Sequence, residues 1–167
     1  MIDNSTAFVE EFKQKYEIDD DIPTDLTALF GKLDVSVLPN VFYADADSYI
    51  LCEFSTDDNG RKTIHYRKEF LAMQGFPEGV VAVLSLGHYI GSGKTDFFLT
   101  HKTKFSEQEK MFAYEILMPR QLVEEILDKI EFPTISILSK IFHVPCEFVK
   151  SRLDVLEITK QIAGYNI

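Results

Sequence analysis

Residues 82–90 carry part of the pattern by which a helix binds zinc. A zinc-peptidase helix has two histidines four residues apart, so that both rings face one metal ion, and a glutamate after the first histidine serves as the base. His88 occupies the second histidine position, whereas Leu84 and Ser85 stand where the first histidine and the glutamate would be. An alkyl chain binds no metal, and a serine hydroxyl is no base near neutral pH. The segment therefore predicts a zinc-site helix without its catalytic groups.

Further blocks follow along the chain, and together they resemble the ImmA/IrrE family of small metallopeptidases. In that family a helix with an H-E-L-G-H core is followed by a helix ending in L-L-M-P and by a helix-turn-helix ending in R-L. The resemblance covers roughly residues 20–158. It implies an α+β fold, with a zincin-like core in which a small antiparallel sheet packs on helices, and with a helix-turn-helix-like C-terminal unit. The matching residues are L-G-H-Y at 86–89, F-A at 112–113, I-L-M-P at 116–119, and Arg152-Leu153.

The resemblance also implies that the third zinc ligand is missing. With Met118 and Pro119 placed on the family pattern, Ser106 and Gln108 stand where the family has acidic residues. Glu107 and Glu109 fall one residue out of phase, which on a helix is a rotation of about 100°. We therefore expect no catalytic residue and no bound metal.

His88 has two other interpretations. A lone histidine on an apolar helix is commonly a core residue that donates to a backbone carbonyl. Alternatively, zinc accepts any tetrahedral set of such donors, so a rearranged site is an alternative. Its metal ligands would be His88, His101 and Glu109, with His65 and Glu107 as further donors.

Composition indicates one main domain. The chain has 167 residues and 46% hydrophobic content, which is enough for a single substantial core. We expect a metallopeptidase-like core over residues 1–132 and helices packed on it over residues 133–167. No run is long enough for a membrane span, and the N-terminus lacks signal-peptide features, so we expect a cytoplasmic protein. Cys52 and Cys146 lie far apart without a C-x-x-C, which favours two reduced, buried thiols.

Charge opposes nucleic-acid binding over most of the surface. The net charge is −10, and an acidic surface repels phosphates. Four basic and three acidic residues give the segment 133–167 a charge of +1, which leaves −11 for the remainder. Only this segment is electrostatically compatible with DNA.

The hydrophobic pattern predicts helices at both ends of the chain and strands near the middle. Asp57-Asp58-Asn59-Gly60 is typical of a hairpin turn in which Asn59 and Gly60 take positive φ angles. Asp25 is expected to cap a short helix, and Ser106 with Glu109 has capping-box spacing. Predicted helices include 106–118 and 122–130, and predicted strands include 35–38, 49–54 and 63–66, with a further strand or an irregular connection between 94 and 105. Periodicity alone allows the apolar segment 78–91 to be a strand or a helix, and the family resemblance favours a buried helix.

Two other motifs favour ordinary structure. Gly91 to Thr95 ends like a phosphate-binding loop, but the motif's first glycine would fall on His88. A turn is therefore expected there. Asp19, Asp20 and Asp21 cannot easily converge on one metal, so we expect an exposed loop.

Residues 134–156 have helix-turn-helix spacing, with a turn at 143–145. We expect Lys150 and Arg152 to be exposed on the second helix, as contacts for a partner or for DNA. A recognition helix commonly presents basic or amide groups at its N-terminal end, whereas this helix begins with Cys146, Glu147 and Phe148. Packing or protein docking is therefore favoured over DNA recognition.

The resemblance implies a substrate-binding surface that recognises a partner without cutting it. We expect a catalytically inactive regulator, without a cofactor, that binds a protein such as a helix-turn-helix repressor of a phage or mobile element. Two alternatives stay open. One is a metallopeptidase with a rearranged zinc site, and the other is a DNA-binding regulator acting through residues 134–156.

Overall fold

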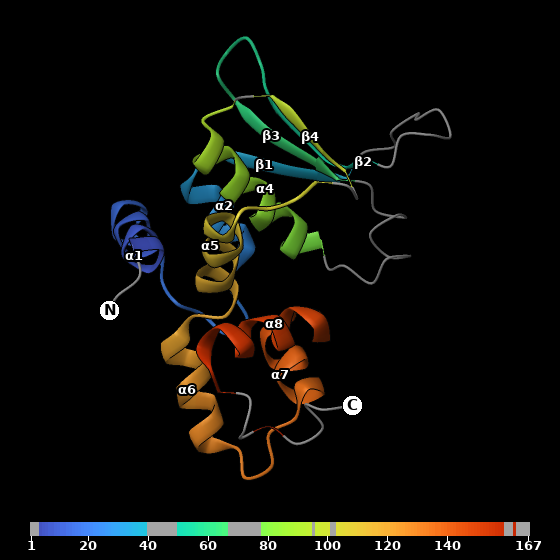
Figure 1. Ribbon diagram of the computed structural model, residues 1–167. Coiled ribbons are helices and arrows are strands. Elements are labelled where there is room, and N and C mark those ends of the chain that lie inside the picture. Colours follow the sequence, from blue (N-terminus) through green and yellow to red (C-terminus); the bar gives the residue numbers. More distant parts are fainter. Residues whose placement is uncertain are drawn as a thin grey trace.

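The computed structural model describes residues 4–39, 50–66, 78–94, 96–100, 103–158 and 162. These residues form seven helices and a four-stranded mixed sheet, which confirms the α+β class. In Figure 1 the sheet lies at one end of the molecule and α6, α7 and α8 at the other, with α5 between them. None of the described helices is both long and apolar enough to cross a membrane.

The elements follow the expected order closely. In chain order they are α1 Asn4–Tyr16, α2 Leu26–Lys32, β1 Val35–Pro39, β2 Ile50–Thr56, β3 Lys62–Tyr66, α4 Glu78–Ser92, β4 Phe97–Thr100, α5 Glu107–Leu117, α6 Arg120–Lys129, α7 Ile135–Phe142 and α8 Cys146–Leu156. The helix expected over residues 78–91 is therefore confirmed as α4, and the further strand between 94 and 105 as β4.

The sheet has the order β1-β3-β2-β4. β2 pairs antiparallel with both β3 and β4, but β1 pairs parallel with β3. The prediction of an antiparallel sheet is therefore wrong for β1. Alternating hydrophobicity identifies a strand but not its neighbour, and β1 lies beside β3 rather than beside β2, its successor in sequence.

The turn between β2 and β3 is held by Asp57. Its carboxylate accepts hydrogen bonds from the backbone N–H groups of Asn59 at 2.8 Å and Arg61 at 2.9 Å. The Arg61 N–H is the main cause of the lowered pKa of Asp57. Gly60 has a φ of 79°, whereas Asn59 does not adopt a positive φ, so the predicted turn conformation is only half right.

The inner face of the sheet is covered by α4 and α2. Phe54 of β2 stacks between Tyr89 of α4 and Phe97 of β4, with ring centroids 4.6 Å and 5.2 Å away. One hydrophobic cluster continues from these residues through Phe112 of α5 to the C-terminal helices. Cys52 is buried in this core as predicted, but Cys146 is exposed at the start of α8, so that part of the thiol prediction is wrong.

Local polar contacts fix the helix starts. The Asp25 side chain accepts from the Ala28 N–H at 2.9 Å, and Ser106 and Glu109 form the predicted capping box. The acidic triplet lies in an exposed loop as expected. One of its side chains also forms an ion pair, in which the Asp20 carboxylate lies 2.8 Å from the Lys13 ammonium group of α1.

Arg152 joins α8 to α5 and is fully buried, with 0% exposure. Its Nη2 lies 2.5 Å from a carboxylate oxygen of Glu115, and its Nε donates to the Met118 carbonyl at 3.0 Å. The expectation that Arg152 is exposed is therefore wrong. Arg152 shares a helix face with the buried Val149 and Leu156, and a buried cation on that face requires a partner that spacing along α8 alone does not reveal.

Removing this ion pair tests how the C-terminal helices are held. Arg152→Met leaves Glu115 buried without its cation, which we expect to lower the free energy of unfolding by about 3–5 kcal/mol. Adding Glu115→Met removes the stranded charge and recovers part of that loss. Urea unfolding of the three proteins measures both effects.

The control is Arg120→Ala, which breaks the exposed pair between Arg120 and Glu124 on α6. A surface pair contributes less than about 1 kcal/mol. If Arg152→Met were as mild as this control, the buried pair would not hold α8 in place.

Candidate functional site

His88 of α4 and Glu109 of α5 form the chemically distinctive pair of the molecule. His88 Nδ1 and Glu109 Oε1 are in direct hydrogen-bond contact. The His88 side chain is 22% exposed, and its ring meets Phe97 edge-on at 4.7 Å. The side-chain hydrogen-bond partner of His88 is therefore a carboxylate, whereas a backbone carbonyl was expected for a core histidine.

Glu109 is one residue out of phase with the family pattern, yet its carboxylate contacts His88. The capping box draws the Glu109 carboxylate back toward the start of α5, where its second oxygen accepts from the Ser106 N–H at 2.5 Å. Since α4 packs beside this end of α5, the first oxygen faces His88. The capping contact with Ser106 therefore determines where the Glu109 carboxylate lies, more than the one-residue shift of Glu109 along the helix does.

Opposing influences set the ionisation of Glu109. Burial favours the neutral acid, but hydrogen bonds from Ser106 and the contact with His88 outweigh burial, so the pKa of Glu109 lies below its ordinary value of 4.5. The carboxylate is therefore ionised at neutral pH.

Gly87 lets the two helices approach closely enough for this contact. A Cβ at position 87 would lie 3.1 Å from the Phe112 ring and 3.4 Å from the Glu109 carbonyl oxygen. One turn later the helices are less crowded, because a Cβ at Gly91 would lie 3.8 Å from Glu109 Cγ.

Ser85, at the position where the zinc-helix pattern has a glutamate, lies in the core. Its hydroxyl donates to the Val81 carbonyl at 2.7 Å and lies 2.7 Å from Cys52 Sγ. Burial raises the pKa of the Cys52 thiol to about 12, so the thiol stays protonated and donates to Ser85. Neither group is an available base or nucleophile.

Leu84, at the position of the first histidine, is half-buried and packs against the hydrophobic core. The face of α4 that includes positions 84 and 88 therefore offers one imidazole and one alkyl chain. It does not offer two nitrogen donors to a metal.

Two of the other candidate zinc ligands, His65 and Glu107, do not join His88. His65 lies on the opposite face of the sheet, because it pairs with Glu53 and alternates with the inward-facing Ile64 and Tyr66. Glu107 is exposed and pairs with Lys110 at 2.7 Å. His101 lies outside the described residues. Among the residues that are described, no three His, Cys, Asp or Glu side chains form a potential metal site.

The pair has a definite chemical character. When Nδ1–H donates to a carboxylate, the ring orientation is fixed and the lone pair lies on Nε2. This is how an outer carboxylate supports a metal-binding histidine, because Nε2 stays free as a donor. The described residues place no further His, Cys, Asp or Glu donors around this nitrogen, so they do not complete a tetrahedral zinc site.

Two remaining sequence motifs have structural roles. Residues 80–90 are helical and lead to β4 rather than to a helix, which excludes a phosphate-binding loop. Lys150 is partly buried and lies 3.6 Å from Glu147, one turn earlier on α8. The Glu147 carboxylate therefore makes the Lys150 ammonium group less available to a partner.

Substitution of Glu109 tests the electrostatic role of the pair. Glu109→Gln keeps an acceptor for Ser106 but removes the charge beside His88. Because the folded-state pKa is lowered, the stabilisation by the carboxylate is fully present above pH 4.5 and is lost as the pH falls through the lower value. We expect a loss of about 1–2 kcal/mol at pH 7 that shrinks towards pH 3.

Urea unfolding at several pH values measures this dependence. Glu107→Gln is the control, since it removes an exposed carboxylate from the same helix turn and should cost less than about 1 kcal/mol. Equal losses for the two variants at every pH would contradict a special role for Glu109.

Comparisons with protein-family models, curated proteins and solved structures found no match to this chain. The likeness to the ImmA/IrrE family thus stays a prediction based on the sequence blocks. The site is described by its own geometry: a histidine–carboxylate pair on two packed helices, beside a serine enclosed in the core.

Proposed function

We propose that the chain is a catalytically inactive, ImmA/IrrE-like regulator that binds a partner protein without cutting it. The partner class we favour is a helix-turn-helix repressor of a phage or mobile element, encountered in the cytoplasm. The proposal that the chain is not catalytic rests on the surroundings of positions 84, 85 and 88 on α4. Leu84 packs against the core, Ser85 is enclosed, and His88 is bound by Glu109.

Peptide hydrolysis needs an activated water, which a zinc peptidase obtains from the metal and a general base. Loss of a general base alone commonly costs 10² to 10⁴ in rate. Here the base position is inaccessible, since Ser85 is fully buried. This supports recognition rather than cleavage, and it makes a metallopeptidase with a rearranged site the weaker alternative.

The outer face of the sheet supports protein binding. Cross-strand pairing places Leu38, His65, Glu53 and Phe98 in one row, because each is opposite the next on its neighbouring strand. Leu38 is 47% exposed and Phe98 is 56% exposed. The described helices that pack on the sheet lie against its other face, so these apolar groups are available to a protein partner.

DNA binding through residues 134–156 is less well supported. Arg152 is buried in an ion pair, and Lys150 lies near Glu147. The net charge of −10 also opposes approach to a phosphate backbone.

Metal content and cleavage test the non-catalytic proposal. We expect native mass spectrometry of tag-free chain, purified with zinc and without chelator, to show no stoichiometric zinc. We also expect a captured partner to keep its intact mass during incubation with the chain. One zinc per chain that is lost in His88→Ala, together with cleavage of the partner, would establish the metallopeptidase instead.

A second test locates the partner surface. The partner is captured by cross-linking in a lysate of the source cells, identified, purified separately, and titrated with the chain. We expect Phe98→Ser to weaken this binding at least about tenfold, because a central buried aromatic commonly contributes 2 kcal/mol or more.

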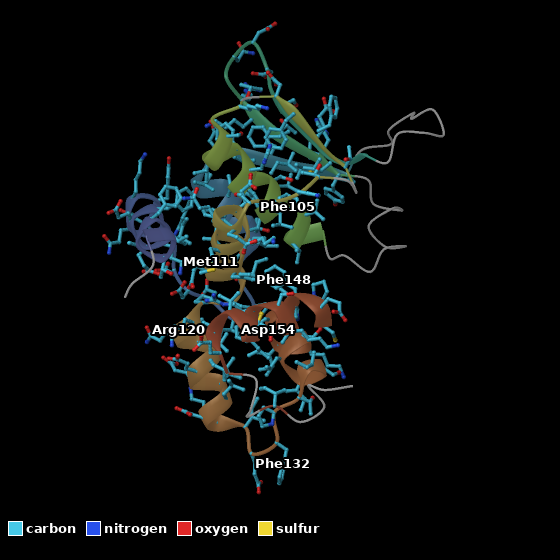
Figure 2. All side chains as sticks on the ribbon, viewed as in Figure 1. Phe105, Met111, Arg120, Phe132, Phe148 and Asp154 are labelled. Carbon is cyan, nitrogen blue, oxygen red and sulfur yellow. The ribbon has the colours of Figure 1, made fainter. Side chains whose placement is uncertain are left out.

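Phe132→Ser is the matched control. Phe132 is more exposed, at 72%, and Figure 2 shows it at the end of the molecule far from the sheet. If Phe132→Ser weakened binding and Phe98→Ser did not, the partner surface would lie on the C-terminal helices, and the assignment to the sheet would be wrong.

A further inference from the structure

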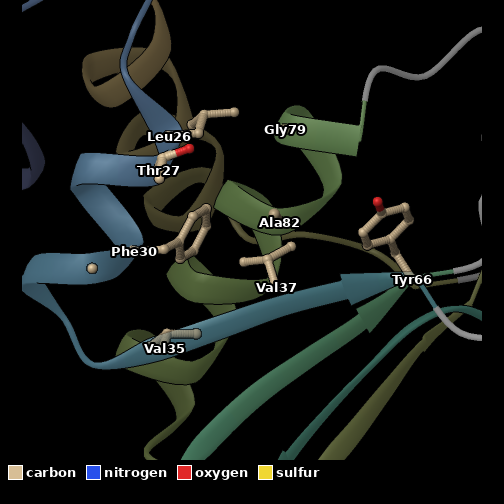
Figure 3. A pocket seen from close by; sticks show the side chains of 9 residues that line it. Leu26, Thr27, Phe30, Val35, Val37, Tyr66, Gly79 and Ala82 are labelled. Carbon is tan, nitrogen blue, oxygen red and sulfur yellow. The ribbon is translucent and has the colours of Figure 1, made fainter.

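A hollow of about 400 Å³ lies between α2, α4 and the β1–β3 pair. It is separate from the His88–Glu109 pair and from the outer face of the sheet. Figure 3 shows Phe30, Val37 and Ala82 around its interior, with Tyr66 at the end of β3 on one side. The volume falls within the range of about 300–1,000 Å³ that is typical of small-molecule sites.

The lining of this hollow is apolar and uncharged. Among the described residues that line it, the side-chain polar groups are the hydroxyls of Thr27 and Tyr66, and none of these residues is an acid or a base. An ionised ligand would lose its water here without gaining a counter-charge, which is costly. The lining therefore favours an uncharged, mainly hydrocarbon molecule.

Two glycines shape the opening. Gly31 is exposed on α2, and a Cβ added there would meet no atom within 4 Å, so space remains beside it. Gly79, at the start of α4, lies against Leu26, because a Cβ there would come within 2.2 Å of Leu26 Cδ1. Leu26 thus closes one side of the hollow, and the missing side chain at position 31 leaves another side open.

Another hollow, formed by described residues elsewhere in the molecule, differs in chemistry. It has a volume of about 290 Å³ and lies between α1, α4 and α5. The ionised Glu109 and the amide of Gln108 contribute to its wall. A ligand that prefers the first hollow because it is uncharged should not prefer the second.

We propose that the hollow between α2, α4, β1 and β3 is a binding site for an uncharged, predominantly hydrocarbon small molecule. Phe30, Val37 and Ala82 supply the contact area. The inference does not depend on the proposed protein partner, because it concerns a different surface and a different class of ligand.

A matched pair of dyes tests the ligand class. Phenylnaphthylamine is uncharged and fluoresces in apolar surroundings, and anilinonaphthalenesulfonate has the same ring skeleton with a sulfonate added. We expect the folded full chain to bind one phenylnaphthylamine, with a rise in melting temperature that increases with dye concentration. We expect the sulfonated dye to bind at least about tenfold more weakly.

Filling the hollow tests the location. Gly31→Leu places a side chain where space is free and replaces glycine by a better helix former. We expect it to keep or raise the melting temperature and to weaken phenylnaphthylamine binding at least tenfold. Ala82→Leu fills the hollow from α4 and should weaken binding likewise, while Gly91→Ala, at the second hollow, should leave it unchanged.

The outcomes separate clearly. Loss of dye binding in folded Gly31→Leu with full binding in Gly91→Ala supports the site, even if Ala82→Leu does not fold. Equal binding by wild type and Gly31→Leu, equal affinity for both dyes, or no binding to the folded wild type would overturn the proposal.

Discussion

The burial of one positive charge constrains the whole C-terminal half of the molecule. An arginine removed from water requires compensating groups, and Arg152 finds them in the Glu115 carboxylate, the Met118 carbonyl and the ring of Tyr114, 5.6 Å from the guanidinium carbon. All three lie on or just after the last turns of α5. The position of α8 is therefore set by the end of α5, and the hydrophobic cluster fills the space around that contact.

Helix α5 connects this constraint to the candidate site. Its last turns carry Glu115, and its first turn carries Glu109, which contacts His88. Tyr114 also meets Phe148 of α8 at 4.9 Å, and Figure 2 shows Phe148 where the C-terminal helices meet the rest of the chain. One helix thus holds the C-terminal unit at one end and orients the partly buried imidazole of His88 at the other.

Features set by neighbouring residues could be predicted from the sequence. The Ser106–Glu109 capping box, the Asp25 cap and most strand and helix types depend on short spacings, and these were confirmed. The helix over residues 78–91 was predicted from the family resemblance instead, because its periodicity also fits a strand. The parallel pairing of β1, the burial of Arg152 and the direction of Glu109 depend on contacts between segments distant in sequence. The positions Leu84, Ser85 and His88 were identifiable from the pattern, but their surroundings were not, because Cys52 and Glu109 come from other elements.

The enclosure of Ser85 limits which residues α4 can carry. Two substitutions, at positions 84 and 85, would produce the H-E-L-G-H motif in the sequence. A glutamate at 85 would nevertheless bring its carboxylate beside the protonated Cys52 thiol and displace the hydroxyl that bonds Val81, and an unpaired buried charge costs several kcal/mol. A zinc-binding helix at this position would therefore require the sheet beneath α4 to change as well, because the core accommodates the serine and not a carboxylate.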